Sequence, residues 1–329
     1  MAILSQAQTI QFKLQHQQTG SSLRGICTVN DKIAWASGSK GTILKTNDGG
    51  ATWQKLTIAG TEKLDFRDVE AFGNNIAYVI SAGSPAKIYK TTDGGATWQE
   101  QYSNTAPDIF FDALAFWNKN KGMAFGDPIN GQFSALLTKD GGKTWQNLNT
   151  SPQAQAGEAG FAASGTCLFA FGKKTVYFGT GGAKARLLKS EDQGQTWNIF
   201  DTPILCGQAS QGIFSVAFKN DKQGILVGGD YQQPPLAQGH CAITSDGGMS
   251  WQLIENQAPA GFRSGVVFVP KSNIAIAVGT NGSDISYDNG KSWKSLNNID
   301  SNSISISSSG KTGWAVSSKG EVFKLVFIP

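Results

Sequence analysis

Three of the four arginines in this chain lie in short segments that resemble one another. The third letters of SLRGI, DFRDV, FFDAL, AASGT and IFSVA, together with the second letter of FRSGV, are interpreted as one register that collects Arg24, Arg67, Asp112, Ser164, Ser215 and Arg263. A guanidinium is planar, permanently charged and able to donate two parallel hydrogen bonds. Several guanidiniums around one space would therefore bind a carboxylate, a sulfate or a phosphate.

A second set of polar residues lies in or near glycine-rich turns. Asp127 lies in Gly-Asp-Pro, Asp230 and Tyr231 lie in Gly-Gly-Asp-Tyr, Glu158 precedes the segment GFAASGT, and Arg186 follows a glycine-rich turn at 179–184. Carboxylates in such a set can bind sugar hydroxyls or act in acid–base catalysis, and Tyr231 is expected at the rim of a site. The alternative is that acids and arginines pair with one another and only fill the interior. No catalytic residue is assigned.

No metal or cofactor site is predicted. The four cysteines show no Cys-x-x-Cys spacing and there are only 2 His, so zinc is not expected. The run GTGG at 179–182 falls in a hairpin rather than in a strand–loop–helix unit, which argues against a dinucleotide. The cysteines are expected to be structural thiols, except that Cys206 and Cys241 flank one repeat and would be placed to form a disulfide in an exported protein.

Six copies of one pattern indicate how these residues are positioned. The pattern [ST]-x-D-x-G-x-[ST]-W, an Asp box, occurs at residues 46–53, 91–98, 138–145, 190–197, 244–251 and 286–293. In a β-hairpin the Asp carboxylate accepts hydrogen bonds from turn N–H groups, the hydroxyls cap neighbouring backbone, Gly adopts positive φ, and Trp packs. The box aspartates are therefore expected to belong to the scaffold.

The spacing of the boxes predicts a β-propeller. The box tryptophans lie 42 to 54 residues apart, the length of a four-stranded blade. The last segment repeats three strands and then stops, whereas Thr9 to Gln15 has the character of a missing fourth strand. Pairing that strand beside Val322 to Val326 would close the ring and remove exposed edges. We predict an all-β, seven-bladed β-propeller that forms one domain over residues 9–329.

The boxes, with the segments DFRDVEAF, FFDALAFW, FGDP, GFAASGT, GIFSVAF, GGDY and GFRSGV, resemble the Asp-box (BNR-repeat) propeller family of photosystem II stability and assembly factors. The resemblance spans nearly the whole chain and is greatest to the non-photosynthetic bacterial branch. It implies that the boxes lie on the rim opposite the binding face and that the protein binds a protein segment. Sialidases also carry Asp boxes, but they normally have six blades and a Tyr–Glu pair, and no such pair is evident here.

Propeller geometry would gather both polar sets at one mouth. The first strand of each blade is innermost, so residues at one register form a ring around the axis. The turns between the second and third strands lie at the end where the first strand begins. The predicted ligand-binding face therefore consists of Arg24, Arg67, Asp112, Asp127, Glu158, Arg186, Asp230, Tyr231 and Arg263.

The predicted function is non-enzymatic binding of a protein segment, an anionic small molecule or a glycan at this arginine-lined face, as the assembly-factor resemblance implies. The insert at 231–240, YQQPPLAQGH, is a candidate contact loop on the same face. The alternative is a carbohydrate-active enzyme, a glycoside hydrolase or sialidase-like protein acting on an anionic glycan. A pair of carboxylates about 5 to 10 Å apart beside an open pocket would favour hydrolysis.

Composition limits the remaining possibilities. The formal net charge is +4 without a basic run, which argues against nucleic acid as a partner. No apolar stretch approaches the ~20 residues that a membrane helix needs. Residues 1–8 include Ser5-Gln6-Ala7, a small-x-small sequence, and are interpreted as the remainder of an export signal or as an added segment. Export to the periplasm or the extracellular space is expected, and a monomer is the default.

Overall fold

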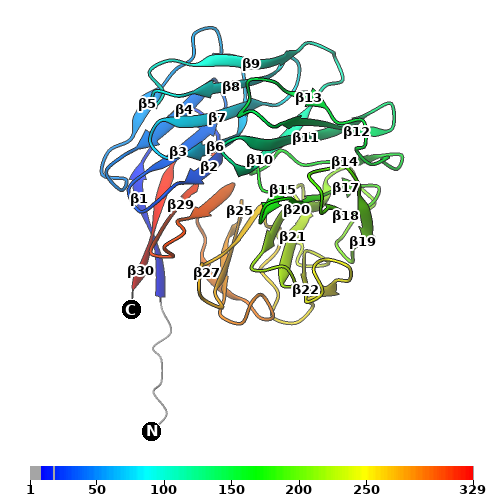
Figure 1. The fold of residues 1–329 in the computed structure, drawn as a ribbon. Coiled ribbons are helices and arrows are strands. Elements are labelled where there is room, and N and C mark those ends of the chain that lie inside the picture. The colour runs from blue at the N-terminus through cyan, green and yellow to red at the C-terminus, as the bar shows by residue number, and fades with distance from the viewer. Residues whose placement is uncertain (1–8, 18, 329) are drawn as a thin grey trace.

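The computed structural model describes residues 9–17 and 19–328, and all regular structure in this part of the chain is β-strand. The strands form seven antiparallel sheets around a common axis (Figure 1). This confirms the predicted all-β, seven-bladed propeller. No helix that could cross a membrane is found among the described residues. The segment interpreted as an export-signal remnant, residues 1–8, lies outside them, and export stays a prediction.

Each of the first three blades has four strands whose hydrogen-bonded order is also their order along the chain. Blade 1 consists of β2 (Leu23–Thr28), β3 (Ala34–Gly38), β4 (Thr42–Thr46) and β5 (Gln54–Leu56). Blade 2 consists of β6 (Phe66–Phe72), β7 (Ile76–Ser81), β8 (Ala86–Thr91) and β9 (Gln99–Asn104). Blade 3 consists of β10 (Phe111–Asn118), β11 (Lys121–Ile129), β12 (Gln132–Thr138) and β13 (Gln146–Asn147).

The next three blades keep this order, and two very short strands extend the sheet of blade 5. Blade 4 consists of β15 (Leu168–Phe171), β16 (Thr175–Gly179), β18 (Arg186–Ser190) and β19 (Asn198–Asp201). Blade 5 consists of β20 (Gln211–Phe218), β21 (Gly224–Asp230), β22 (Cys241–Thr244) and β23 (Gln252–Leu253), and its sheet is extended by β14 (Glu158–Ala159) and β17 (Gly181–Gly182). Blade 6 consists of β24 (Gly265–Phe268), β25 (Ala275–Gly279), β26 (Gly282–Ser286) and β27 (Lys294–Asn297).

The seventh blade joins the two ends of the chain. It consists of β28 (Ser303–Ile306), β29 (Thr312–Val316), β30 (Val322–Ile328) and β1 (Thr9–His16). β1 pairs antiparallel with β30 from Thr9 opposite Ile328 to His16 opposite Val322, and the two run side by side in Figure 1. The predicted closing strand is therefore confirmed. It covers the edge that β30 would otherwise expose.

The Asp boxes form identical hydrogen-bonded hairpins. In the first, Asp48 Oδ1 accepts from Thr52 N at 2.9 Å, Asp48 Oδ2 accepts from Thr52 Oγ1 at 2.7 Å, and Thr46 Oγ1 accepts from Gly50 N at 2.9 Å. The hydrogen bonds from Thr52 lower the pKa of Asp48 to about 2. Gly50 has a φ of 89°, which favours glycine. The box carboxylates are thus occupied within their own turns, as a scaffold role requires.

The boxes lie at the end of the propeller where the innermost strands finish. Gly49 N donates to Lys32 O at 2.9 Å, and Gly247 N donates to Lys222 O at 2.9 Å; both acceptors are in turns that follow an innermost strand. Arg24 and Arg67 lie near the starts of such strands, β2 and β6. The boxes and the arginines therefore occupy opposite rims, as predicted.

Apolar side chains from adjacent blades pack together and form the core. One cluster joins blades 3 and 4 through Phe125 and Phe178, whose ring centroids are 4.3 Å apart. All four cysteines have free thiols, so the disulfide considered between Cys206 and Cys241 is not formed. The two residues belong to different clusters, since Cys206 packs between blades 4 and 5 and Cys241 between blades 5 and 6.

Closure of the ring can be tested at Ile10, which is 3% exposed and packs with Leu325 and Ile304. Ile10→Ala should lower the free energy of unfolding by about 2 to 5 kcal/mol, because it leaves a cavity in blade 7. Lys13→Ala, on an exposed position of the same strand, should change it by less than about 0.5 kcal/mol. Urea denaturation measures both variants, and equal stabilities would contradict a closing role for β1.

Candidate functional site

A cavity of about 460 Å³ opens at the end where the innermost strands begin. Every blade, or the segment that leads into it, contributes at least one residue to the lining. Its lining consists of Arg24, Arg67, Phe110, Asp112, Asp127, Gly160, Phe161, Ala162, Ala163, Phe214, Tyr231, Phe262, Ser264, Thr280 and Asn302. The structure therefore brings together five of the nine residues predicted for the binding face: Arg24, Arg67, Asp112, Asp127 and Tyr231.

A β-bulge directs Arg24, Arg67 and Asp112 to the mouth of this cavity. In blade 1, Leu23 pairs with Gly38 and Gly25 pairs with Ser37, so that Arg24 between them has no partner. The same register shift occurs at Arg67 in β6 and at Asp112 in β10. A bulge adds one residue to a strand and re-aims its side chain. The predicted equivalence of these three residues is correct.

The alignment is wrong for the other three residues of the predicted ring. In β20 the bulge residue is Phe214, because Ile213 pairs with Gly228 and Ser215 with Val227. In blade 6, Ser264 N donates to Val278 O, which places Ser264 and not Arg263 beside the cavity. A shift of one residue along a strand turns a side chain to the other face. In blade 5 residue type alone does not reveal that shift, whereas in blade 6 the third letter of FRSGV is already Ser264 and the predicted register displaces that segment by one residue.

Ser164 lies in a segment that crosses the central channel. We call residues 160–166 the plug segment. Ser164 Oγ donates to Ser264 O of blade 6 at 2.7 Å, and Ser303 Oγ of blade 7 donates to Ser164 O at 2.9 Å. Residues 160–163 line the mouth cavity, whereas residues 164–166 line a second cavity on the other side. The plug segment therefore divides the channel into two cavities.

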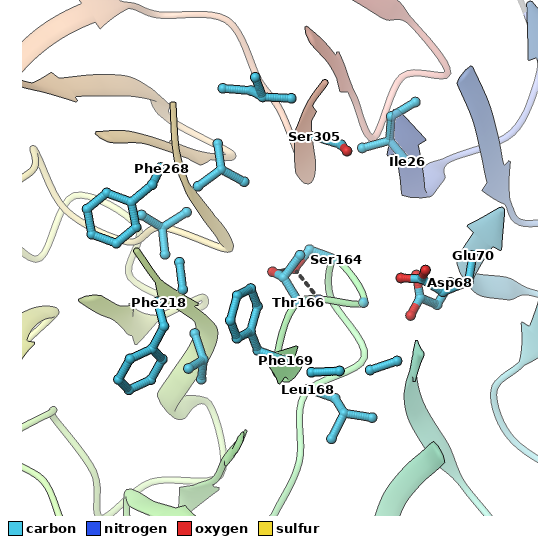
Figure 2. Close-up of a pocket in the computed structure, with 18 of the residues that line it drawn as sticks. Ile26, Asp68, Glu70, Ser164, Thr166, Leu168, Phe169, Phe218, Phe268 and Ser305 are labelled. Atoms are coloured by element: carbon cyan, nitrogen blue, oxygen red, sulfur yellow. Dashed lines mark hydrogen bonds between the residues drawn. The ribbon is translucent and has the colours of Figure 1, made fainter. Parts of the chain in front are cut away.

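The second cavity, of about 320 Å³, is lined by apolar side chains and by two acids of β6. Figure 2 shows Asp68 and Glu70 facing Ser164 and Thr166 across it. Asp68 accepts hydrogen bonds from Val69 N and Leu114 N, each at 2.8 Å. Burial raises the pKa of both carboxyls, and the charge of Asp68 further raises that of Glu70. Neither acid was predicted as a site residue, and Asp68 links blades 2 and 3.

Arg24 and Arg67 carry the positive charge of the mouth. Arg67 is paired with Asp65 at 2.6 Å, and its Nη1 donates to Ala162 O of the plug segment at 2.8 Å. Arg24 belongs to none of the ion pairs among the described residues, and its buried Nε has no hydrogen-bond partner there. Burial, and next the charge of Arg67, lower the pKa of Arg24, and the charges of Asp65 and Asp300 oppose this shift without reversing it. An anion between the two guanidiniums would relieve that unfavourable environment.

Asp112 and Asp127 provide a contrasting pair of acids at the same cavity. Asp112 is fully buried, and neither of its carboxyl oxygens has a hydrogen-bond partner among the described residues. Burial, and next the charge of Asp127, raise the pKa of Asp112 well above its ordinary value. Burial also raises the pKa of Asp127, whose Oδ1 accepts from Gly160 N at 2.8 Å. Asp112 is therefore expected to hold a proton at pH values where an exposed Asp is ionised.

Glu158 and Arg186 form a buried ion pair outside the cavity lining. Arg186 Nε donates to Glu158 Oε1 at 2.8 Å, and Arg186 Nη2 donates to Glu158 Oε2 at 2.5 Å. Thr180 Oγ1 and Gln155 N also donate to this carboxylate, at 2.6 and 2.8 Å. Every oxygen of Glu158 is thus satisfied internally, and the pair links the approach to blade 4 with β18. The structure places both residues in a support role rather than at the mouth.

Arg263 is likewise neutralised. It is 1% exposed, its Nε donates to Asp284 Oδ2 at 2.6 Å, and its Nη1 donates to Asn281 Oδ1 at 2.6 Å. The alternative that acids and arginines pair with one another therefore describes Glu158, Arg186 and Arg263, and also Arg67, which is paired with Asp65. It does not describe Arg24.

Asp230 and Tyr231 separate at the end of β21. Asp230 is buried in a neighbouring hollow, where Gln211 Nε2 and Gln232 N donate to it at 3.2 and 2.9 Å. Burial by itself would raise the pKa of Asp230, but hydrogen bonds from Ser210, Gln211 and the following backbone outweigh it and lower that pKa. Tyr231 is 47% exposed at the cavity rim, where the sequence placed an aromatic residue.

Aromatic side chains form a further part of the cavity lining, the aromatic wall, and only Tyr231 among them was predicted. It consists of Phe110, Phe161, Phe214, Tyr231 and Phe262. The Phe161 and Phe214 rings stack at 3.9 Å, and Phe262 meets Phe214 edge-on at 4.7 Å. A signal was present, because GFAASGT, GIFSVAF and GFRSGV each carry Phe one or two residues after Gly.

Comparisons with known proteins agree with the fold. Residues 4–107 match the model of a family described as photosynthesis system II assembly factor YCF48, which confirms the resemblance to that family over this part of the chain. The bacterial branch stays a prediction. No curated protein matches the sequence.

Three similar solved structures are propellers of low sequence identity. One, YCF48 bound to D1 peptide, is 17% identical with a TM-score of 0.70 and 98% coverage of both chains. YCF48 from Cyanidioschyzon merolae is 16% identical with a TM-score of 0.68, covering 96% of this chain and 98% of that one. The GH74 xyloglucanase from Xanthomonas campestris is 16% identical with a TM-score of 0.66, covering 95% of this chain and 53% of that one. At these identities the similarity shows the fold alone.

The buried carboxyl of Asp112 should make stability depend on pH. Its pKa is raised in the folded state, so the free energy of unfolding falls as pH rises from about 3.9 toward that raised value. Asp112→Asn removes this titration. The free energy of unfolding of this variant, relative to that of the wild type, should therefore rise by up to about 1.4 kcal/mol per pH unit in that window. Urea denaturation at several pH values between 4 and 7 measures the difference, with Asp108→Asn, an exposed position, as control. A difference independent of pH would contradict the assignment.

Proposed function

We propose that this chain, whose residues 4–107 match the YCF48 assembly-factor family, is a non-enzymatic propeller that binds an acidic protein segment at its arginine-lined mouth. The observation that carries the proposal is the state of Arg24. It is a partly buried guanidinium near a second guanidinium, it lines an open cavity, and its Nε has no hydrogen-bond partner within residues 9–17 and 19–328. Such a group is poorly solvated and poorly paired, so a carboxylate ligand would supply what the fold omits.

The pairing of the other arginines supports this choice of site. Arg186 and Arg263 have their own acids within 3 Å and are nearly inaccessible. Arg67 is divided between Asp65 and the plug segment, which fixes the direction of its guanidinium toward the cavity. The two accessible guanidiniums are therefore those of Arg24 and Arg67, which line the same cavity and are close enough for the charge of Arg67 to lower the pKa of Arg24. We propose that one anionic group contacts both.

A known complex of the same fold supports a protein segment as the class of ligand. The similar structure described as YCF48 bound to D1 peptide shows that a propeller of this shape binds a peptide. A cavity of about 460 Å³ lies within the range of about 300–1,000 Å³ that is usual for ligand pockets. It is large enough for a few side chains of an extended segment.

Peptide selection tests the proposal. Random dodecapeptides displayed on phage should be enriched in Asp and Glu by the wild type, and synthetic peptides from that selection should bind the Arg24→Ala, Arg67→Ala double variant at least about tenfold more weakly. The affinity should also fall with salt, because the contact is ionic. Fluorescence anisotropy measures both effects.

The matched control removes two exposed lysines on the box rim, Lys55→Ala and Lys143→Ala, and so carries the same net charge as the arginine variant. It should bind like the wild type. Equal losses in the two double variants would show that only overall charge matters, and a selection without enrichment would overturn the proposal.

A second candidate function is hydrolysis of a glycan, and one observation favours it. Asp112 and Asp127 line one cavity, neither is paired with an arginine, and the pKa of each is raised, which is the state of a general acid. Assays of reducing-sugar release from xyloglucan and from sialylated oligosaccharides separate the two functions. We expect no turnover. Turnover that Asp112→Asn abolishes, with peptide binding retained, would favour the enzyme.

A further inference from the structure

The mouth cavity has two chemically different walls, and the arginines occupy only one of them. The other wall is built from aromatic rings of blades 3, 5 and 6 and of the plug segment: Phe110 precedes β10, Phe161 lies in the plug segment, Phe214 is in β20, Tyr231 follows β21, and Phe262 precedes β24. Phe214 and Phe262 are each 2% exposed, whereas Phe110 and Phe161 are partly exposed and Tyr231 is 47% exposed. The buried ring of Phe214 contacts the accessible rings of Phe161 and Tyr231 and the buried ring of Phe262.

The accessible rings are arranged as the sides of a receptacle. Tyr231 stands edge-on to Phe161, at 6.5 Å and 75°, and edge-on to Phe214, at 6.1 Å and 72°. Phe161 and Phe214 are nearly parallel, with an interplanar angle of 15°. Aromatic side chains prefer such stacked and edge-on arrangements, and a further ring or a large aliphatic group can extend them.

Packing and hydrogen bonds hold parts of the aromatic wall in place without a ligand. The ring of Phe161 lies directly against the backbone of two glycines, so that a Cβ on Gly181 or Gly212 would come within 2.2 or 2.7 Å of it. The loop that begins with Tyr231 is fastened to blade 6, because Pro234 O accepts from Phe262 N at 2.9 Å and from Asn281 Nδ2 at 2.8 Å. A receptor that is ordered in advance loses less entropy on binding.

We infer that the segment bound at the mouth carries an aromatic or large aliphatic side chain within about three residues of its acidic group, seated against Phe161 and Tyr231. The inference rests on the proposed function and specifies the class of ligand. The acidic group and the apolar group would contact different parts of one cavity of about 460 Å³, and an extended strand rises about 3.3 Å per residue, so residues that are close together in the ligand sequence would occupy both subsites. A segment with acidic residues and no apolar residue nearby would leave the accessible rings of the aromatic wall exposed to solvent in the complex.

The same phage selection, analysed for composition, tests this inference. The wild type should enrich dodecapeptides that contain Phe, Tyr, Trp, Leu or Ile within three residues of Asp or Glu. Enrichment of acidic peptides without an apolar neighbour would overturn the inference and leave the proposed function intact. Absence of acidic enrichment would instead overturn the proposed function, so the two failures are distinguishable.

A double-mutant cycle on one enriched synthetic peptide locates the subsite. Replacing the apolar residue of the peptide by Ala should weaken binding to the wild type about tenfold, and to Tyr231→Ala by less than about threefold. Tyr231→Phe keeps the ring and should behave like the wild type. Met249→Ala removes an apolar residue that is 59% exposed on the box rim and should also behave like the wild type. The same tenfold loss on Tyr231→Ala would show that the apolar residue binds elsewhere.

Discussion

The antiparallel pairing of β1 with β30 is the constraint on which the mouth of this propeller depends. Blades 7 and 1 meet at the seam that this pairing closes, and the innermost strands on its two sides are held by direct contacts. Asn302 Nδ2 donates to Leu23 O at 2.7 Å, and Thr28 N donates to Ser305 Oγ at 2.9 Å. Arg24 follows Leu23 directly, so the position of its guanidinium depends on a ring that closes. The site is a property of the whole circle rather than of one blade.

The sequence revealed the frame because the frame repeats. Six boxes, their spacing and the orphan strand at 9–15 were enough to predict seven blades and their closure. Arg24, Arg67 and Asp112 were also placed correctly, since the first three blades share a bulge at the same distance from their strand starts. Prediction succeeded where blades are alike in length and register.

Prediction failed where a blade departs from its neighbours. In blade 4 the chain crosses the channel before β15 begins, so Ser164 is a plug residue and not a strand residue. The partners of Arg186 and Arg263, Glu158 and Asp284, are 28 and 21 residues away along the chain, and nothing local announces which acid meets which arginine. Identical residue types thus serve as internal support in blades 4 and 6 and as an open site in blades 1 and 2. Burial and pairing, not composition, separate these roles.

The unequal walls of the mouth give the propeller a direction. Guanidiniums stand over blades 1 and 2, and aromatic rings stand over the region from the approach to blade 3 round to blade 6. Seven similar blades would not by themselves favour one orientation of a ligand across the mouth, but this uneven lining does. A segment recognised by both walls can lie across the mouth in one orientation only, and the rest of its chain must then leave over a particular blade. The propeller would therefore determine the orientation of its partner as well as its binding.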